Sequence, residues 1–305
     1  MAKTSDEIIV AFGIDANYAP HMAVVVASII ANSPNARFRF MILNDGIPKA
    51  EQLKLESVAQ GHTFDWCSMD DLRILSLKTK THVSRASYYR IAIPTVAPEN
   101  AERVIYLDSD IVVIGDLVDL WKSDLEGKSI GAVFDINVDS VDFAKRWDLA
   151  PSRLNYFNAG ILVLDLKKIR AEKKINNAFD LLASQWDKLV YDDQCLLNVL
   201  YWNDWKLLDP VWNFQRNMIL PNLEQTSFAT PEEIPSGRRP KIVHFTQTNK
   251  PWSVDAYHPF VWLYYKYLRR TPYWSQVNRS ARTTFMKHLR RFIKTQVYLR
   301  KYHRE

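Results

Sequence analysis

Two aspartates separated by one residue stand at the end of an apolar run. Asp108-Ser109-Asp110 follows the apolar segment 104–107 and precedes the apolar segment 111–114. Two carboxylates at the carboxyl end of a buried strand lose hydration unless a cation or hydrogen-bond donors meet them. The position favours a divalent-cation site, and the alternative is a structural turn. An EF-hand calcium loop is disfavoured, because the next acidic position and the glycine it requires are missing after Asp110.

A histidine ends another apolar run, in Val243-His244-Phe245. Such a histidine can also be an ordinary residue of a packed core. Two carboxylates and one imidazole suit a manganese or magnesium ion of octahedral geometry, whose remaining positions are filled by diphosphate oxygens. An ion of this kind would neutralise a nucleoside diphosphate that leaves as a sugar bond breaks. The hypothesis is therefore a metal centre formed by Asp108, Asp110 and His244.

Alternating β-rich and helical runs must position these residues. The pattern predicts β/α units around a mostly parallel sheet, which binds ligands at the carboxyl ends of its strands. Strands are expected at 8–12, 38–43, 63–67, 104–107, 130–134, 161–166 and 241–245. Helices are expected at 22–30, 49–59, 167–186, 195–201 with Asp192-Asp193-Gln194 at its start, 259–268 and 283–298.

The segment 210–240 is predicted to be irregular, because prolines and a glycine break any long element in it. These residues are Pro221, Pro231, Pro235, Gly237 and Pro240. A loop-rich lobe that binds an acceptor would fit there. The chain divides on this interpretation into a catalytic domain at 1–255 and an aromatic and basic helical region at 256–305.

Composition limits the class of protein. A chain of 305 residues that is 47% hydrophobic can bury a large core. The two cysteines, Cys67 and Cys195, imply no disulfide framework. We find neither a signal peptide nor an apolar stretch long enough to span a membrane, so a cytoplasmic protein is expected. The net charge of +6 gathers near the end of the chain, which disfavours nucleic-acid binding by the main domain.

Six blocks in order carry a family resemblance. They are Ala11-Phe12-Gly13-Ile14-Asp15-Ala16-Asn17-Tyr18, Ser87-Tyr88-Tyr89-Arg90, Tyr106-Leu107-Asp108-Ser109-Asp110, Phe157-Asn158-Ala159-Gly160, Asp192-Asp193-Gln194 and His244-Phe245-Thr246-Gln247-Thr248-Asn249-Lys250-Pro251-Trp252. Over residues 8–255 the chain resembles glycosyltransferase family 8, particularly its bacterial lipopolysaccharide galactosyl- and glucosyltransferases. The resemblance implies a GT-A fold and transfer of a hexose from a UDP-sugar with retention of configuration.

The resemblance also implies roles for individual residues around the nucleotide. Asp15 and Asn17 would bind the uridine, and Tyr18 would stack on the uracil; the alternative for Asn17-Tyr18 is a helix start. Asp108, Asp110 and His244 match the metal ligands, with Asp108 also near the ribose and the donor sugar. Lys250 matches a residue that contacts the diphosphate. The family commonly has glycine where this chain has Gln247, which puts tight closure of that loop in question.

Five further residues match positions that hold the donor hexose: Arg90, Asp135, Asn158, Asp193 and Gln194. Alternatives are a surface charge for Arg90, a strand cap for Asp135 and a plain turn for 157–160. Gln194 would lie at the reactive face of the sugar. Because an amide is a poor nucleophile, this favours front-face displacement, with Asp193 as the alternative nucleophile or electrostatic stabiliser. His82 and Tyr191 match positions near the acceptor.

Other classes of function are weighed against this one. A dinucleotide-dependent oxidoreductase is disfavoured, because no Gly-x-Gly-x-x-Gly follows the first strand. A glycoside hydrolase would need a carboxylate pair but no diphosphate ligands. A carbohydrate-binding protein without turnover stays open. At the other end of the chain, Phe285, Leu289, Phe292, Ile293 and Val297 form one stripe of a basic amphipathic helix, which predicts attachment to an anionic membrane surface; the alternative is a helix docked on its own domain.

Overall fold

The computed structural model describes residues 7–70, 85–219, 228–230, 232–234, 238–246, 250–253, 258–280, 289–290, 292–293 and 297. Its strands are β1 Ile8–Gly13, β2 Phe38–Asn44, β3 Thr63–Ser68, β4 Arg103–Leu107, β5 Ile111–Val113, β6 Ile130–Phe134, β7 Phe157–Asp165, β8 Trp205–Leu207, β9 Phe214–Gln215 and β10 Ile242–His244. Its α-helices are α1 Ala19–Asn32, α2 Lys49–Glu56, α4 Tyr89–Val96, α5 Leu117–Trp121, α6 Ser140–Arg146, α7 Leu166–Glu172, α8 Ala178–Gln185, α9 Asp192–Leu200, α10 Arg216–Ile219, α11 Val261–Leu268 and α12 Trp274–Ser280. Short 3-10 helices are η1 Ala16–Tyr18, η2 Ser57–Ala59, η3 Arg85–Tyr88, η4 Lys174–Asn177, η5 Trp186–Lys188 and η6 Pro210–Asn213.

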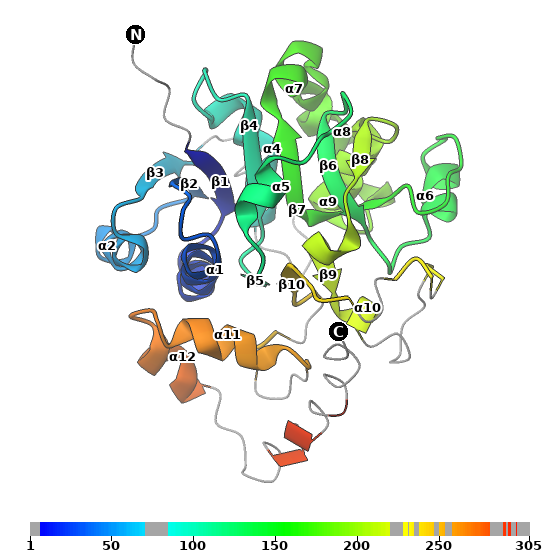
Figure 1. Ribbon diagram of the computed structural model, residues 1–305. Coiled ribbons are helices and arrows are strands. Elements are labelled where there is room, and N and C mark those ends of the chain that lie inside the picture. Colours follow the sequence, from blue (N-terminus) through cyan, green and yellow to red (C-terminus); the bar gives the residue numbers. More distant parts are fainter. Residues whose placement is uncertain are drawn as a thin grey trace.

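A seven-stranded sheet forms the centre of the molecule, in the order β3-β2-β1-β4-β7-β6-β8 (Figure 1). Four of its strand pairs are parallel, and only β7 runs antiparallel to its neighbours β4 and β6. The reversal places the amino end of β7 beside the carboxyl ends of β4 and β6. Residues that begin β7 therefore reach the same edge of the sheet as residues that follow β4 and β6. The predicted mostly parallel α/β sheet is confirmed.

A second, three-stranded sheet adjoins this edge, in the order β5-β10-β9. Three residues separate the end of β4 from the start of β5, and β10 pairs with β5 antiparallel, with His244 opposite Ile111. Strand β9 lies on the other side of β10. Part of the segment 210–240 is thus regular, because η6, β9 and α10 occupy residues 210–219, whereas the sequence predicted irregular structure.

Apolar packing surrounds both sheets. Helices α4 and α7 pack against the large sheet, and α9 packs against β7. The first helix, α1, is buried at every position from Ala19 to Ile29 because it packs against β5 and against α11, which Figure 1 shows lying across it. Asn32 fixes this arrangement, since its amide donates to the carbonyl oxygen of Val113 and to the hydroxyl of Tyr267.

Two sequence expectations are wrong in their bounds. The helix expected at 167–186 is broken into α7, η4 and α8, because Lys173 adopts a left-handed conformation with φ 57° that ends α7. The strand expected at 161–166 begins at Phe157, so Asn158 and Gly160 belong to β7 and do not form a turn before it. The second correction matters for the site, because it places the candidate residue Asn158 within a strand.

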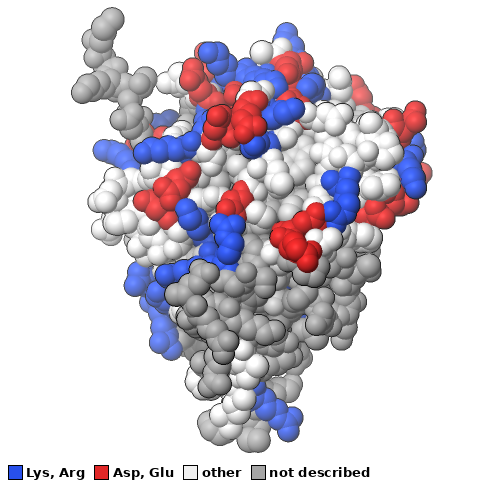
Figure 2. Space-filling model, turned by 45° about the vertical axis from the view of Figure 1, so that its right-hand side comes forward, with Lys and Arg blue, Asp and Glu red and all other residues white. Residues whose placement is uncertain are grey.

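The surface and the C-terminal region add two observations. Figure 2 shows a face on which acidic and basic side chains are interspersed over its upper part. Within the described residues, no helix combines the length and apolar character needed to cross a bilayer. The helix predicted at 283–298 lies largely outside the described residues; the described positions 289–290, 292–293 and 297 are helical and exposed.

Candidate active site

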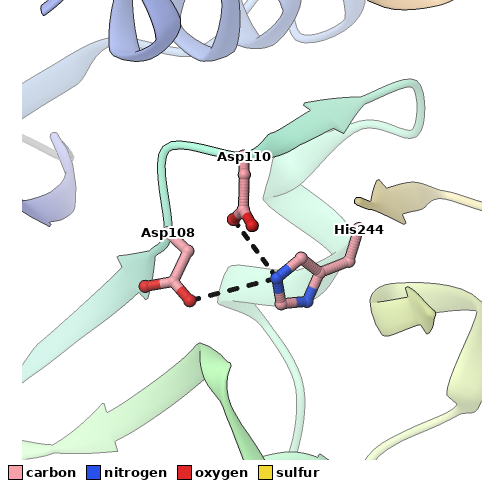
Figure 3. A group of neighbouring side chains, drawn as sticks. All are labelled: Asp108, Asp110 and His244. Atoms are coloured by element: carbon pink, nitrogen blue, oxygen red, sulfur yellow. Dashed lines mark ion pairs between the residues drawn. The ribbon is translucent and has the colours of Figure 1, made fainter. Parts of the chain in front are cut away.

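Three side chains converge where β4 ends and the small sheet begins. Asp108 follows β4, Asp110 precedes β5 and His244 ends β10, and Figure 3 shows the three pointing toward one another. Nε2 of His244 lies 3.2 Å from Oδ1 of Asp110 and 3.9 Å from Oδ2 of Asp108. One ligand atom from each residue lies within 4.8 Å of the other two. The spacing and the donor types fit one octahedral Mn²⁺ or Mg²⁺ ion.

Backbone pairing sets this convergence. The amide of Asp108 donates to the carbonyl oxygen of Gly160 at 2.8 Å, which extends the β4–β7 ladder beyond Leu107. The amide of Phe245 donates to the carbonyl oxygen of Asp110 at 2.9 Å, which extends the β5–β10 ladder. Both aspartates are therefore held by strands on either side of them.

Gly160 leaves the space that the three side chains occupy. A Cβ atom at this position would lie 2.4 Å from Cε1 of His244 and 2.7 Å from Oδ2 of Asp108. Both distances are too short for atoms that are not bonded, so any side chain here would displace the candidate ligands. A glycine is required by close approach and not by its own backbone conformation.

Lys250 contacts the same carboxylate from another side. Its ammonium group donates to Oδ2 of Asp110 and, at 2.9 Å, to the carbonyl oxygen of Phe245. Burial would raise the pKa of Asp110, but Lys250 and His244 hold that pKa well below its usual range. Asp110 is therefore ionised and available as a ligand.

Arg90 contacts the cluster through Asp108 and is almost fully buried. Its guanidinium group lies 3.0 Å from Oδ1 of Asp108 and 2.9 Å from Oδ2 of Asp193, and it donates to the carbonyl oxygens of Ser87 and Ala159. The group also stacks over the ring of Tyr106, at 4.5 Å from the centroid. Arg90 is thus no free surface charge, and it bridges two carboxylates.

The two carboxylates that Arg90 bridges differ in their surroundings. Burial raises the pKa of Asp193 to about 6 although Arg90 opposes the change. Asp108 accepts a further hydrogen bond, at 2.9 Å, from the hydroxyl of Tyr106. Burial also raises the pKa of Tyr106 well above its usual value, so its hydroxyl stays protonated and continues to donate.

Asp135, Asn158 and Gln194 form one hydrogen-bonded group. Oδ2 of Asp135 accepts from Nδ2 of Asn158 at 3.0 Å and from Nε2 of Gln194 at 3.1 Å. The amide oxygen of Gln194 accepts from the backbone of Ala159 at 3.0 Å. Oδ1 of Asp135 accepts from the backbone of Asn137, as expected for the strand-cap alternative. Oδ2 makes the contacts with Asn158 and Gln194, so Asp135 has both roles.

The residues expected to hold the uridine lie where β1 ends. Oδ1 of Asp15 accepts from the backbone of Asn17 and of Tyr18, which starts η1, so Asp15 has a structural role there. The ring of Tyr18 meets the edge of Trp252 at 6.1 Å between centroids. Trp252 stacks in turn on His21 at 3.5 Å, which holds the segment after Lys250 against α1.

A cavity of about 330 Å³ joins most of these residues. Seven of the candidate side chains line it: Tyr18, Arg90, Asp108, Asp110, Asp193, Gln194 and Lys250. Asp135, Asn158 and His244 are not among its lining residues and are at most 7% exposed. Tyr191 lines the cavity as well and is 49% exposed, so it lies at the rim. The cavity lies at the carboxyl ends of β1 and β4, where such sheets bind ligands.

Some residues fall outside this picture, and others were missed. His82 and Gln247 lie outside the described residues, so their predicted roles stay predictions. Sequence reasoning missed Asn213, whose Oδ1 lies 2.9 Å from Nδ1 of His244, and the close approach of Gly160. Gly160 could have been found from its position in the motif Phe157-Asn158-Ala159-Gly160. Asn213 could not, because it lies in a segment that contains no recognised motif.

The large sheet, with β7 antiparallel between β4 and β6 and the carboxylate–histidine cluster at its edge, has the GT-A fold, as the likeness to solved structures shows. The crystal structure of galactosyltransferase LgtC in complex with donor and acceptor sugar analogs superposes with a TM-score of 0.73 at 23% identity, covering 93% of this chain and 99% of that chain. General stress protein A of Bacillus subtilis (strain 168) is 27% identical over 274 residues, covering 88% of this chain and 94% of that protein. Lipopolysaccharide 1,2-glucosyltransferase of Escherichia coli (strain K12) is 27% identical over 296 residues, covering 92% and 83%. Residues 9–256 match the sequence profile described as glycosyl transferase family 8, and the chain therefore belongs to that family.

Proposed function

We propose that this glycosyltransferase moves galactose or glucose from a UDP-sugar to a hydroxyl group of a surface glycan, with retention of anomeric configuration. The observation that carries the proposal is the convergence of Asp108, Asp110 and His244 beside a cavity that Lys250 and Tyr18 also line. Carboxylate, imidazole and ammonium groups together suit a metal-bound diphosphate, and an aromatic ring nearby suits a base. The cavity thus offers a place for each part of a UDP-sugar.

Asp108, Asp110 and His244 would hold Mn²⁺ or Mg²⁺. When bound, such an ion supplies positive charge to the diphosphate oxygens as the sugar leaves. Lys250 would contact the diphosphate as a point charge from the side of Asp110 that faces away from His244. Asp15 and Asn17 would meet the uridine, and Tyr18 would stack on the uracil.

The contacts of Gln194 support front-face displacement. Its amide oxygen accepts a backbone hydrogen bond and its amide nitrogen donates to Asp135, so both contacts hold in place a side chain that is a poor nucleophile. Asp193 is held by Arg90 at ion-pair distance, which suits a carboxylate that stabilises positive charge on the sugar ring. The acceptor hydroxyl would then attack from the side on which UDP departs, and positioning would supply most of the rate enhancement.

The acceptor is proposed to be lipopolysaccharide or another surface polysaccharide. Relatives named as lipopolysaccharide glucosyl- and galactosyltransferases support this class of acceptor. Tyr191 at the cavity rim offers an exposed aromatic surface for an acceptor sugar. Residues 1–255 would form the catalytic domain, working in the cytoplasm.

The C-terminal region is proposed to attach the enzyme to the membrane surface. Leu289, Phe292, Ile293 and Val297 are between 41% and 61% exposed and recur at helical spacing. Apolar side chains at this spacing beside Arg290 and the surrounding basic residues suit insertion into an anionic leaflet. Sedimentation with vesicles that contain phosphatidylglycerol tests this: binding that persists after Phe292→Ser and Ile293→Ser would contradict it.

The decisive experiment is a donor screen. Purified protein is incubated with Mn²⁺ and each of several nucleotide sugars, and release of the free nucleoside diphosphate is measured. UDP release from UDP-galactose or UDP-glucose, abolished by EDTA and restored by Mn²⁺, supports the proposal. No release from any donor favours a carbohydrate-binding protein without turnover.

A matched pair of variants assigns any activity to the metal centre. Asp110→Asn removes one ligand charge while keeping the shape of the side chain, and we expect loss of Mn²⁺ binding and of UDP release. Asp148→Asn is the control, because Asp148 is exposed and its φ of 54° is one that asparagine adopts readily. Full activity in Asp110→Asn would refute the proposed centre.

A further inference from the structure

Four buried polar side chains form a hydrogen-bonded row that ends at His244. The row runs from Asp135 through Asn158 and Asn213 to His244, and each member is at most 7% exposed. It links the residue that follows β6 to β7, η6 and β10, which are far apart in the sequence. A buried polar row of this kind is stable only when every donor meets an acceptor. The order of donors and acceptors along the row therefore determines which nitrogen of His244 carries a proton.

The backbone of Gly160 fixes the direction at Asn158. An amide N–H can only donate, and that of Gly160 points to Oδ1 of Asn158 at 3.1 Å. This atom must therefore be the oxygen of the side-chain amide, and the nitrogen of Asn158 faces Asp135. The side chain cannot be turned over without opposing a donor to a donor at Gly160.

The direction then passes through Asn213. Oδ1 of Asn158 also accepts from Nδ2 of Asn213 at 2.9 Å, so the oxygen of Asn213 is the atom that faces His244. That oxygen lies 2.9 Å from Nδ1 of the imidazole. Because an amide oxygen only accepts, Nδ1 must carry the proton. Nε2 is then the nitrogen left to bind a metal ion, and it is the atom that faces Asp108 and Asp110.

We propose that Asn213 is a positioning residue that fixes the ring orientation and the tautomer of His244, with Asn158 fixing the direction of Asn213. This rests on the proposed role of His244 as a metal ligand. Partners of this kind orient the ligating nitrogen and raise its basicity, and their loss typically weakens metal binding. Because Asp135 accepts from both Asn158 and Gln194, the row also joins the proposed sugar-binding group to the metal centre.

The tautomer can be measured directly. Protein labelled with ¹⁵N-histidine is examined by NMR near pH 8, and the His244 signals are identified by their loss in His244→Gln. We expect Nδ1 of His244 to carry a proton both with and without Mg²⁺. A ring protonated at Nε2 alone would overturn the proposal, and this measurement needs no variant of Asn213 to fold.

Three variants test the consequence for the metal. Mn²⁺ alone is titrated and free Mn²⁺ is followed by electron paramagnetic resonance. Asn213→Ala should weaken binding by about 10- to 100-fold, the usual cost of losing such a partner. Asn213→Asp retains an oxygen that accepts from Nδ1, so its Mn²⁺ affinity should recover from that of Asn213→Ala toward that of the parent protein. The variant should unfold more easily, because its second carboxylate oxygen would face Oδ1 of Asn158, which is also an acceptor.

Asn44→Ala is the matched control. Asn44 is also a buried asparagine, 5% exposed, whose amide bonds four backbone groups around the end of β2 and touches none of the row. It should lose stability and keep its Mn²⁺ affinity. Equal Mn²⁺ affinity in Asn213→Ala and the parent, or no recovery in Asn213→Asp, would overturn the positioning role. If the parent protein itself failed to bind Mn²⁺, the proposed metal centre would be wrong, while the NMR result would still decide the tautomer.

Discussion

The two carboxylate oxygens of Asp110 face two different residues. Oδ1 lies 3.2 Å from Nε2 of His244, whereas Oδ2 accepts a hydrogen bond from Lys250, 140 residues further along the chain. One oxygen is thus turned toward the proposed metal centre and the other toward the residue proposed to hold the diphosphate. The ammonium group and a bound metal ion would both draw on the charge of this single carboxylate.

Lys250→Met should therefore separate the binding of metal from the binding of nucleotide. Without the ammonium group, Mn²⁺ alone should bind at least as tightly, because a competing cation is gone. UDP in the presence of Mn²⁺ should bind about tenfold or more weakly, as expected for the loss of a hydrogen bond to a charged group. Calorimetric titration of both ligands checks this, with Lys145→Met on the exposed side of α6 as control. Weaker binding of Mn²⁺ alone would contradict the competition.

Gly160→Ala should weaken metal binding while the protein stays folded. The added methyl group would meet His244 and Asp108 at 2.4 and 2.7 Å, so the ligands must move apart. We expect an overpacking cost of about 1 to 3 kcal/mol and a loss of Mn²⁺ affinity of well over tenfold. Gly131→Ala is the control, because that Cβ would meet only apolar side chains, of Leu125 and Leu208. Mn²⁺ binding retained in Gly160→Ala would show that the ligands relax.

The raised pKa of Asp193 predicts that the free energy of unfolding depends on pH. Its pKa is raised to about 6 from an ordinary value of 3.8. Between these values the folded protein holds a proton that the unfolded chain has lost, so the contribution of this residue to stability falls as pH rises. Asp193→Asn removes the effect, and its stability relative to the parent should increase between pH 4 and 7 by at most about 3 kcal/mol. Urea unfolding at both pH values checks this; a constant difference between Asp193→Asn and the parent protein would contradict it.

Arg170 should stabilise the connection between α4 and β4 without affecting catalysis. Its guanidinium group donates to five backbone carbonyl oxygens, those of Pro94, Ala97, Pro98, Glu99 and Ala101. An ammonium group cannot reproduce this fork, so Arg170→Lys should reduce the free energy of unfolding by about 2 to 4 kcal/mol. Thermal unfolding measures the loss, and Lys167→Met on the exposed side of the same helix is the control. An unchanged melting temperature would be inconsistent with this role.

The sequence predicted elements wherever apolar patterning was continuous. The strand expected at 8–12 and that at 130–134 lie within a residue of their observed bounds, because buried strands of this kind read as apolar runs. The helix break at Lys173 could not be foreseen, since lysine has no preference for a left-handed conformation. Asn158 and Gly160 are common in turns, which hid the first residues of β7.

The candidate site was predictable where motifs follow strands. Asp108 and Asp110 could be placed at the carboxyl edge of the sheet because β4 was clear, and His244 was grouped with them by its ligand type, although its place in a second sheet was not predicted. Asn213 could not, because its partners belong to β7 and β10 and nothing in the local sequence distinguishes it. Long-range hydrogen bonds between polar side chains leave no periodic signal in a sequence.

The short ladder between β5 and β10 has a consequence for how this enzyme can vary. His244 faces the two aspartates only because it pairs with Ile111, and successive residues of a strand point to opposite sides. A slip of one position would present Val243 or Phe245 in its place and turn the imidazole away. Length changes before Lys241 should be tolerated if they leave this alignment intact, whereas a single inserted residue between Ile242 and His244 should inactivate the protein without unfolding it.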